Sequence, residues 1–526
     1  MDLFELYRQL ERRVCWWIPT CTLVIIAGVW AVFSAVRSYT RLRHIPGPRL
    51  AALTNLVRRS WVITGNAHEI HTDLHRKYGK VVRFGPNAVM VSQPGVIEKI
   101  YGFKNRFQKA SHPPNLLYTA GSLADGFKSE FYDSIMPRVK GGKIPDVFAT
   151  RDEDIHRRMR RPVANLYSVT SLTNFEPLIT STMQYFFIRV DEIFSDKNVE
   201  FDLYRWIQFF MFDVLGEVTF SQRLGVLEKA ADVEDVIENL WLYFEKVAPN
   251  TQMQWLDYLW RDNPLVPVSS KRNALAEFGA ARIMERMSQA EGSENDKNDF
   301  LSYFIKEKAK DNTLPDMFVP TWVNSNIVAG ADTTSIVASA LMYHLLKNPS
   351  SLSKLKREID DAVAMGRISK YVTWRESQNL PYLEACVNEA TRMHPPFALP
   401  FERIVPDSGL EVDGYFVPPG TRVGMSPWVV HRDESIFGGD PEAWRPERWL
   451  CSEKKKTTMY NTLLTFGAGH RTCLGKHLAY YEIYKLIPSI LQRYDIQLVN
   501  PAEDWSINNR WLAKPSGFRV KLSTRG

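Results

Sequence analysis

The sequence has few cysteines and no usable site for N-glycosylation. Five cysteines occur among 526 residues, and no two of them form a CxxC pair. Neither a disulfide framework nor a four-cysteine zinc site is therefore expected. The Asn-x-Ser match at Asn348 has proline as its middle residue, which excludes glycosylation. Both features indicate that the chain works in a reducing compartment.

Long basic tracts, internal repeats and low-complexity segments are also missing. The net charge is +7, but the Lys and Arg residues stand in short runs. A protein that binds nucleic acid would concentrate this charge, so no nucleic-acid partner is expected. The composition of 45% hydrophobic and 24% charged residues is that of a globular protein with a large core.

Charged residues are absent from one long stretch near the N-terminus, residues 14–36. This run can span a bilayer, which requires about 20 residues. We expect a membrane anchor at residues 1–43, with a transmembrane helix over about residues 15–36. A cleaved signal peptide is the alternative, but its apolar core would be shorter and a small-residue cleavage site should follow. Basic residues are slightly more numerous after the run, which places the rest of the chain in the cytoplasm.

A proline-rich hinge, residues 44–50, separates this anchor from one large domain, residues 51–526. Apolar spacing predicts short strands around residues 81–92 and 410–423 and a mainly helical middle from about residue 152 to 370. Within that middle, one long helix is expected over about residues 321–346. The expected fold class is therefore mainly α with small β-sheets (α+β).

The segment FGAGHRTCLG, residues 466–475, gives Cys473 an unusual setting. Its glycines permit close approach of a flat ligand. A strongly helical pattern begins directly after the cysteine. Cys473 is therefore expected near a helix N-terminus, where the helix dipole and free backbone N–H groups favour a thiolate.

Such a thiolate has three interpretations. It can be a nucleophile with His470 or His477 as the base. It can bind zinc together with His470 and His477, although this set lacks a fourth ligand. It can also bind haem iron, and this interpretation explains more: the glycines admit the porphyrin, Phe466 packs beside it and Arg471 pairs with a propionate.

The segment resembles the cytochrome P-450 signature F-x-x-G-x-R-x-C-x-G and matches it at every defined position. Three further motifs of that family stand in the expected order, so the resemblance covers essentially the whole chain. It implies the cytochrome P-450 fold and a haem b cofactor (iron protoporphyrin IX), with Cys473 as the axial ligand of the iron. Residues 205–220 and 454–479 resemble the pisatin-demethylase-like branch of fungal members.

The EATR motif places Glu389 and Arg392 one helical turn apart, where opposite charges interact. An exposed ion pair would contribute little. The flanking residues are apolar, however, so we expect a partly buried pair with further partners. Arg448, in the WRPERW motif, supplies one. The resemblance implies that these three residues form a structural network that holds the cysteine loop.

The AGADTTS motif, residues 329–335, lies within the long predicted helix. Gly330 and the threonines lower helix propensity, so a poor helical patch is the simplest interpretation. The resemblance implies a catalytic pair instead: Asp332 relays protons from solvent, Thr333 orients water and bound dioxygen, and Gly330 leaves room above the iron. A haem-thiolate isomerase or dehydratase without O₂ activation, or a non-catalytic haem sensor, would not need this pair.

Further basic residues are assigned to the haem propionates by the resemblance. His156 and Arg160, in HRRMRR, have the spacing of a family pair that contacts them, although many members carry Trp where His156 stands. A solvated basic face is the alternative. Arg403 lies where family members often place another such contact.

The segment after Cys473 is too short to contain flavin domains, so electrons are expected from a separate protein. For a single-pass member of the endoplasmic reticulum membrane with its catalytic domain facing the cytoplasm, the resemblance implies NADPH–cytochrome P-450 reductase, and cytochrome b5 as a further partner. The expected reaction is monooxygenation of a hydrophobic small molecule. The reaction is expected to belong to fungal secondary metabolite biosynthesis (of a terpenoid, polyketide or alkaloid) or, alternatively, to detoxification of a xenobiotic or phytoalexin. Residues 107–143, 239–260, 328–333 and 396–401 are expected to line its pocket.

Overall fold

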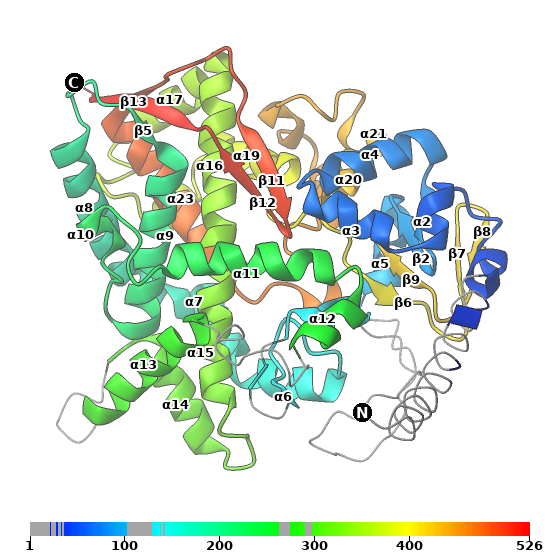
Figure 1. The fold of residues 1–526 in the computed structure, drawn as a ribbon. Helices are drawn as coiled ribbons and strands as arrows, with labels where there is room; N and C mark the ends of the chain where they lie inside the picture. Colours follow the sequence, from blue (N-terminus) through cyan, green and yellow to red (C-terminus); the bar gives the residue numbers. More distant parts are fainter. Residues whose placement is uncertain are drawn as a thin grey trace, which may run out of the picture.

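The computed structural model describes residues 22, 28, 29, 33, 36–102, 129–136, 138–139, 142–261, 274–289 and 297–525. The predicted membrane span, about residues 15–36, lies almost wholly outside them. Within the described part of the chain, no helix is both long enough and apolar enough to cross a bilayer. The described residues are mainly helical with small sheets (Figure 1), which confirms the predicted fold class.

The longer helices gather on one side of the molecule, and the strands near the N-terminus lie on the other (Figure 1). These longer helices are α8 (Glu176–Ile193), α9 (Leu203–Phe220), α11 (Val236–Asn250), α13 (Ala274–Gln289), α14 (Phe300–Lys310), α15 (Phe318–Ala329), α16 (Asp332–Lys347), α17 (Pro349–Ala364), α19 (Pro381–Met393) and α23 (Lys476–Arg493).

The remaining helices, most of them shorter, connect and cover these elements. The α-helices among them are α2 (Arg49–Leu53), α3 (Leu56–Ile63), α4 (Ala67–Tyr78), α5 (Ile97–Tyr101), α6 (Glu153–Val163), α7 (Val169–Leu172), α10 (Val226–Lys229), α12 (Gln254–Arg261), α18 (Trp374–Ser377), α20 (Pro427–Val430), α21 (Glu434–Phe437) and α22 (Glu453–Thr462). Single 3₁₀ turns include η1 (Pro94–Val96), η2 (Glu130–Ser134), η3 (Ala164–Tyr167), η4 (Thr173–Phe175), η6 (Pro446–Trp449) and η7 (Gly469–Arg471).

The strands form small sheets. One has the order β1-β2-β9-β6, in which β2 and β9 are parallel and the other pairs antiparallel. A second has the order β10-β13-β5, and three pairs, β3-β4, β7-β8 and β11-β12, complete the described set. The bounds are β1 (Val81–Gly85), β2 (Ala88–Val91), β3 (Arg138–Val139), β4 (Gly142–Lys143), β5 (Phe201–Asp202), β6 (Arg403–Ile404), β7 (Leu410–Val412), β8 (Tyr415–Val417), β9 (Arg422–Gly424), β10 (Tyr494–Leu498), β11 (Ser506–Arg510), β12 (Leu512–Ser516) and β13 (Arg519–Thr524).

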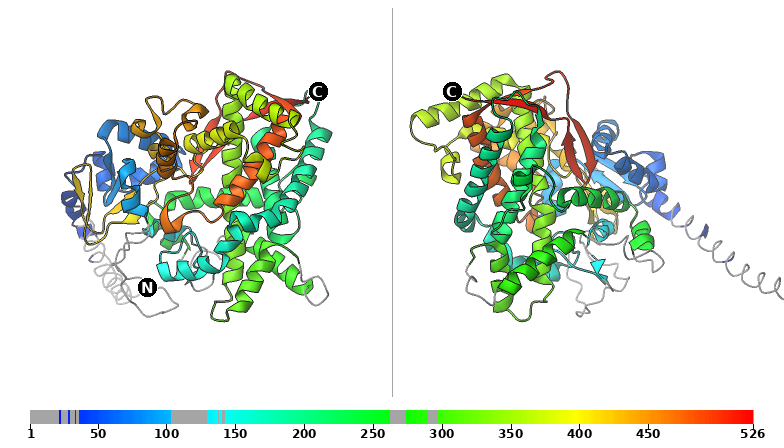
Figure 2. Two further views of the ribbon diagram at one scale, coloured as in Figure 1. Left: turned by 180° about the vertical axis from the view of Figure 1, so that it is seen from behind. Right: turned by 60° about the vertical axis from the view of Figure 1, so that its left-hand side comes forward.

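The core surrounds α16. This helix packs against α9, α17, α19 and α23, and it stands among them in both views of Figure 2. Nearly every residue of α9 and most residues of α16 are buried. A polar side chain on the buried part of these two helices therefore lies inside the protein, where a hydrogen-bond partner is favoured.

The prediction of one long helix over residues 321–346 is wrong in one respect, because the structure has two helices there with a break between them. Helix α15 ends at Ala329 and α16 begins at Asp332. The hydroxyls of Thr333 and Thr334 donate to the carbonyls of Ala329 (2.8 Å) and Gly330 (3.2 Å), a competition with backbone bonds that bends helices. Low helix propensity at Gly330 and the threonines therefore produces a break within the AGADTTS motif.

The structure gives a packing reason for Gly330. A Cβ atom at this position would lie 2.8 Å from Leu215 Cδ1 and 2.8 Å from the carbonyl oxygen of Asn326. The missing side chain thus faces α9, so the described packing requires glycine for the close approach of the two helices.

Candidate active site

The loop that carries Cys473 connects η7 to α23. The Cys473 N–H donates to the Phe466 carbonyl at 2.8 Å, which closes the loop on itself. Gly469 has φ +66°, and a Cβ atom there would lie 1.8 Å from the carbonyl oxygen of Tyr101. No other residue fits this position, because the chain is both left-handed and in contact with the end of α5.

The Cys473 sulfur has donors and positive charges around it. The side chain is exposed, and it faces the backbone N–H groups of Gly475 and Lys476 and the charges of Arg160 and Lys476. Although the side chain is open to solvent, the protein around it displaces much of the water, and this desolvation raises the pKa of the thiol; the donors and charges lower it by less. The predicted lowering by the helix N-terminus is therefore present but smaller than the effect of burial.

A glutamate that sequence analysis did not identify holds the loop to α6. Glu153 accepts hydrogen bonds from Arg471, at 2.7 and 3.1 Å, and lies 3.1 Å from His470 Nε2. Burial alone would raise the pKa of Glu153, but the bonds and charges of His470 and Arg471 lower it to about 2. His156, one turn further along α6, is buried, and its Nδ1 lies 3.7 Å from Glu153.

The basic residues predicted to contact propionates lie in two places, one near Cys473 and one beside Tyr132. Arg160 lies close to Cys473, so that the cysteine affects its pKa. Arg403, on β6, donates to the hydroxyl of Tyr132 at 3.3 Å. Burial lowers the pKa of Arg471, and the charge of Arg403 lowers it further. Arg403 and Arg471 therefore lie near each other, beside Tyr132.

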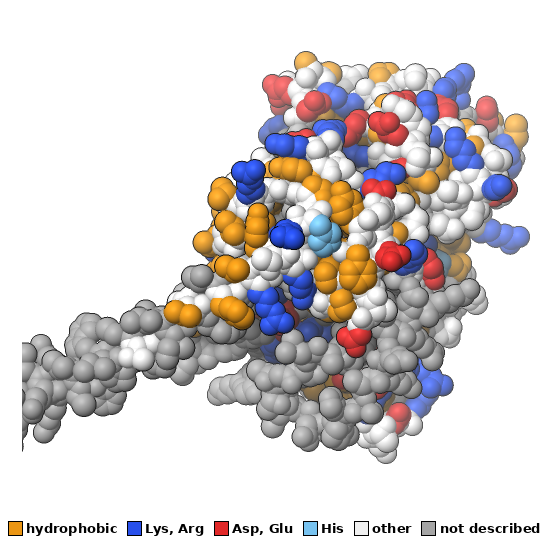
Figure 3. All heavy atoms as spheres, turned by 90° about the vertical axis from the view of Figure 1, so that its right-hand side faces the viewer, with side chains coloured by type: hydrophobic (Ala, Val, Ile, Leu, Met, Phe, Trp, Pro, Cys, Tyr) orange, Lys and Arg blue, Asp and Glu red, His pale blue; other side chains and the backbone are white. Residues whose placement is uncertain are grey.

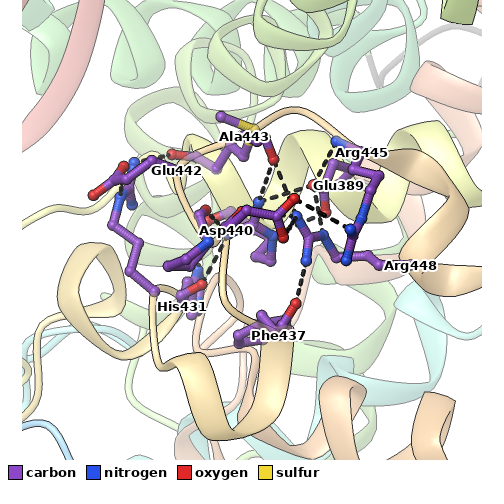
Figure 4. A network of polar contacts seen from close by, with 12 residues as sticks. Glu389, His431, Phe437, Asp440, Glu442, Ala443, Arg445 and Arg448 are labelled. Atoms are coloured by element: carbon purple, nitrogen blue, oxygen red, sulfur yellow. Dashed lines mark hydrogen bonds and ion pairs between the residues drawn. The ribbon is translucent and has the colours of Figure 1, made fainter.

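The EATR and WRPERW motifs meet in a buried network (Figure 4). Both oxygens of Glu389 accept from Arg392 at 2.8 Å, and Oε1 also accepts from Arg448 Nε at 2.8 Å. Trp449 Nε1 donates to Oε2 at 2.9 Å. Burial raises the pKa of Glu389, but these partners, Arg392 first, lower it overall. Glu389 is therefore an ionised carboxylate inside the protein.

His431 connects this network to the cysteine loop. Arg392 donates to the His431 carbonyl at 3.0 Å, and the Leu464 N–H donates to His431 Nε2 at 2.7 Å. Because Nε2 accepts, Nδ1 carries the proton and donates to the Arg392 carbonyl at 3.0 Å. Burial lowers the pKa of His431 to about 3, in agreement with a neutral ring. Thr465 adds a second link, a 2.8 Å bond to the Thr391 carbonyl.

Asp332 and Thr333 are adjacent but take different partners. The Thr333 hydroxyl donates to the carbonyl of Ala329 in the preceding turn. Asp332 is 2% exposed and accepts a hydrogen bond from Gln208 of α9. Burial raises the pKa of Asp332, whereas Gln208 and the charge of Lys514 lower it by less.

Neither alternative interpretation of Cys473 gains support. No group of three or more His, Cys, Asp or Glu side chains suited to a metal ion occurs in the described part of the chain, so the predicted zinc set does not assemble. His470, the first candidate base, faces Glu153.

Comparison with known proteins identifies the class. The family model described as Cytochrome P450 matches residues 124–522, more than half of the chain. The chain therefore belongs to the cytochrome P450 family, and it is an oxygen-incorporating oxidoreductase, a monooxygenase, with a haem-thiolate cofactor. Members of this family generally take electrons from a redox partner and act on hydrophobic substrates.

Three fungal proteins show how far the similarity extends. The chain is 53% identical to cytochrome P450 monooxygenase cicH of Emericella nidulans over 487 residues. This alignment covers 92% of this chain and 94% of cicH. The chain is 45% identical over 473 residues to a cytochrome P450 monooxygenase of Aspergillus terreus (88% and 92% covered). With cytochrome P450 monooxygenase pkfB of Emericella nidulans the identity is 39% over 509 residues, covering 96% of each chain.

Proposed function

We propose that Cys473 is the axial ligand of a haem b iron, and that the chain inserts an oxygen atom into a hydrophobic small molecule of fungal secondary metabolism. The observation that carries this proposal is the setting of Cys473. An exposed sulfur faces two backbone N–H groups and two cationic side chains, at the end of a loop that Gly469 and Glu153 fix in place.

The residues around the sulfur fit a haem. The charge of a bound metal ion makes a coordinating thiol lose its proton even where the pKa of the free thiol is raised, and the nearby donors would stabilise the thiolate. Arg471 is already paired with Glu153, but among the described residues the nearby Arg403 bonds only to neutral oxygens, so the group keeps a positive charge that anionic propionates would neutralise. His156 and Arg160 of α6 are proposed as further propionate contacts, and Phe466 as a packing partner of the porphyrin.

The chain's own residues would then supply protons, orient water and hold the cysteine loop. Bound haem supplies iron-centred dioxygen activation, which a thiolate ligand promotes. Burial raises the pKa of Asp332, which favours its protonated form over that of an exposed aspartate, so the side chain is suited to take up a proton and pass it on. The Thr333 hydroxyl gives its hydrogen to Ala329, so its lone pairs can accept a hydrogen bond from water. The Glu389 network would keep the cysteine loop at a fixed position.

Residues 51–526 are proposed as the catalytic domain, held to the endoplasmic reticulum membrane by residues 1–43 and the hinge at 44–50. The uncharged run of residues 14–36 supports this arrangement. The face that carries α2, α3 and the β7–β8 hairpin shows hydrophobic side chains between Lys and Arg residues (Figure 3), and Leu50, Leu56 and Phe416 are exposed there. A catalytic domain facing the cytoplasm would receive electrons from NADPH–cytochrome P-450 reductase, and from cytochrome b5.

The spectrum of the reduced, CO-bound protein tests the ligand. Wild type is expected to show a Soret band near about 450 nm. Cys473→Ala should lose this band, whereas Cys451→Ser, a second partly exposed free cysteine outside the loop, should keep it. A band near 450 nm in the Cys473 variant would overturn the assignment.

The monooxygenase step is tested by product analysis with labelled oxygen. Intermediates of fungal secondary pathways are supplied with the reductase, and ¹⁸O from O₂ is expected in the product. Thr333→Ala and Asp332→Asn should divert electrons from product to hydrogen peroxide by tenfold or more, on the order of a general acid's contribution. Product formed with unlabelled oxygen, or without O₂, would favour isomerase or dehydratase chemistry.

A further inference from the structure

Gln208 is a polar side chain inside an apolar stretch of α9. It is fully buried, and it reaches from α9 to Asp332, the first residue of α16. Its Nε2 donates to Asp332 Oδ1, and the same nitrogen lies 3.3 Å from the hydroxyl oxygen of Tyr204. Its Oε1 is buried and has no hydrogen-bond partner within the part of the chain that the structure describes. One end of the amide is thus used and the other is not.

A buried amide oxygen without a partner is unfavourable, so its retention beside the relay acid calls for a reason. The two ends of an amide have nearly the same shape and exchange places by a half-turn. An ionised Asp332 requires an N–H donor, which Gln208 supplies in the described orientation. A protonated Asp332 requires an acceptor, and the half-turn would bring Oε1 to that place.

The groups around Asp332 shift its pKa in opposite directions. Burial raises its pKa, and Gln208, Lys514 and Arg205 oppose this, in that order. Asp232 raises it slightly, and Tyr204 faces the carboxyl as a neutral phenol, its own pKa well above the ordinary value. Lys514 Nζ lies over the Trp241 ring at 4.6 Å. Within the part of the chain that the structure describes, the hydrogen bond to the Asp332 side chain comes from a neutral amide, that of Gln208.

We propose that Gln208 is the positioning residue of the proton relay, and that its amide holds Asp332 in both protonation states by exchanging its donor end for its acceptor end. In one cycle the O–H bond of Asp332 breaks, and its proton passes toward the place where dioxygen would be reduced. A new O–H bond then forms on Asp332 with a proton from solvent. No electron is transferred in this step. An Arg or Lys partner would hold the carboxylate ionised, whereas an apolar partner would leave it unsolvated. The inference rests on the proposed role of Asp332.

The first test measures the protonation of Asp332 directly, in the full-length ferric protein. Infrared spectra are recorded as a function of pH, and the band of the protonated carboxyl is identified by its loss in Asp332→Asn. In Gln208→Leu the carboxylate loses its N–H donor, so the band should persist to a pH higher by about one to two units. Gln208→Met, which is unbranched and close in length, repeats the measurement should the leucine variant fail to bind haem.

The matched control is Thr219→Val. Thr219 lies on the same helix, is fully buried, and has a hydroxyl without a described partner. Its removal should leave the Asp332 midpoint unchanged. The proposal would be overturned if the pH midpoint of the Asp332 carboxyl band in both Gln208 variants stayed within about 0.3 pH units of wild type, as in the control.

The second test separates donor from acceptor. Gln208→Glu keeps an oxygen at both ends but removes the N–H donor, so two acids would share one proton and titrate as a pair. We expect a further rise of the midpoint and a larger solvent isotope effect on product formation. In Gln208→Leu, the share of electrons lost to hydrogen peroxide should rise about tenfold. A peroxide share unchanged in both variants contradicts a positioning role.

The outcomes distinguish this inference from the proposed function. If Asp332→Asn retains normal product formation and isotope effect, the relay role of Asp332 fails, and with it the basis of the inference. If Asp332→Asn diverts electrons to peroxide but the Gln208 variants behave as Thr219→Val does, only the inference about Gln208 fails.

Discussion

At the scale of single residues, Glu482 shows how burial alone sets a charge state. It lies on α23, nine positions after Cys473 in the sequence, and is 2% exposed. Burial raises its pKa well above the ordinary value, and the Thr334 hydroxyl opposes this only partly. Burial therefore favours the neutral form of this carboxyl, which lies next to Thr334, the threonine that follows Thr333.

Glu482→Gln is expected to stabilise the protein at neutral pH. The folded state keeps a proton that the unfolded state releases above the ordinary pKa of 4.5. Wild-type stability therefore contains a contribution that is complete below pH 4.5 and is lost as pH rises toward the raised folded pKa. Thermal unfolding of the haem-loaded protein at about pH 5 and pH 8 measures it. The variant should gain on wild type between these values, and parallel pH dependences would contradict the prediction.

At the scale of elements, the Glu389 network joins α19, η6 and the segment that leads into the cysteine loop. Arg392 and Arg448 share one carboxylate, and both arginines also bind backbone carbonyls of residues 431–443. A network of this kind fixes geometry more than it adds stability, since buried ions lose their hydration.

Glu389→Gln should lower the free energy of unfolding by about 3–5 kcal/mol, because two buried guanidinium groups lose their counter-charge. Glu442→Gln is the control: Glu442 also binds an arginine, Arg432, but is 52% exposed, and its loss should cost about 1 kcal/mol or less. Urea unfolding followed by the haem absorbance measures both. Similar losses in the two variants would show that burial of the network does not matter.

The contact of the cysteine loop with α5 gives a second prediction at this scale. Gly469→Ala places a Cβ atom on the Tyr101 carbonyl and strains a left-handed backbone. We expect a loss of more than about 3 kcal/mol and a shift of the CO band away from about 450 nm. Gly439→Ala, where a Cβ atom meets nothing within 4 Å, should leave both unchanged. A normal spectrum in Gly469→Ala would mean that the loop tolerates movement.

At the scale of the whole molecule, buried and half-buried histidines make the fold sensitive to acid. Burial lowers the pKa of six of them to about 3 or 4: His68, His71, His75, His344, His394 and His431. Each is neutral in the folded protein, whereas the unfolded chain protonates it below its ordinary pKa of 6.5.

Stability is therefore expected to fall as the pH decreases from about 6.5 toward 4. Depressed pKa values contribute stability that is present above the unfolded value and lost toward the folded one. Each fully depressed group adds up to about 1.4 kcal/mol per pH unit, so cooperative unfolding should occur before the individual folded values are reached. Chemical unfolding at several pH values measures this slope. A flat profile between about pH 6.5 and 5 would contradict it.

Much of the fold and of the site follows from local patterns. FGAGHRTCLG, EATR and AGADTTS each place their residues within one loop or one helical turn, where spacing alone determines which side chains are neighbours. Periodicity likewise predicted the strands around residues 81–92 and 410–423 and the mainly helical class. It missed the break at Gly330, because the apolar spacing of this run favours a helix while Gly330 and the threonines disfavour one, and the two effects have similar size.

By itself the sequence determined the family and the residues of each motif, because these depend on contacts between near neighbours. Only the tertiary structure decided their partners. Gln208 meets Asp332 across 124 positions, and Glu153 meets Arg471 across 318. No periodicity within one segment identifies which distant side chain reaches a buried charge. That choice depends on how helices pack around α16, where a buried polar atom without a partner is unfavourable.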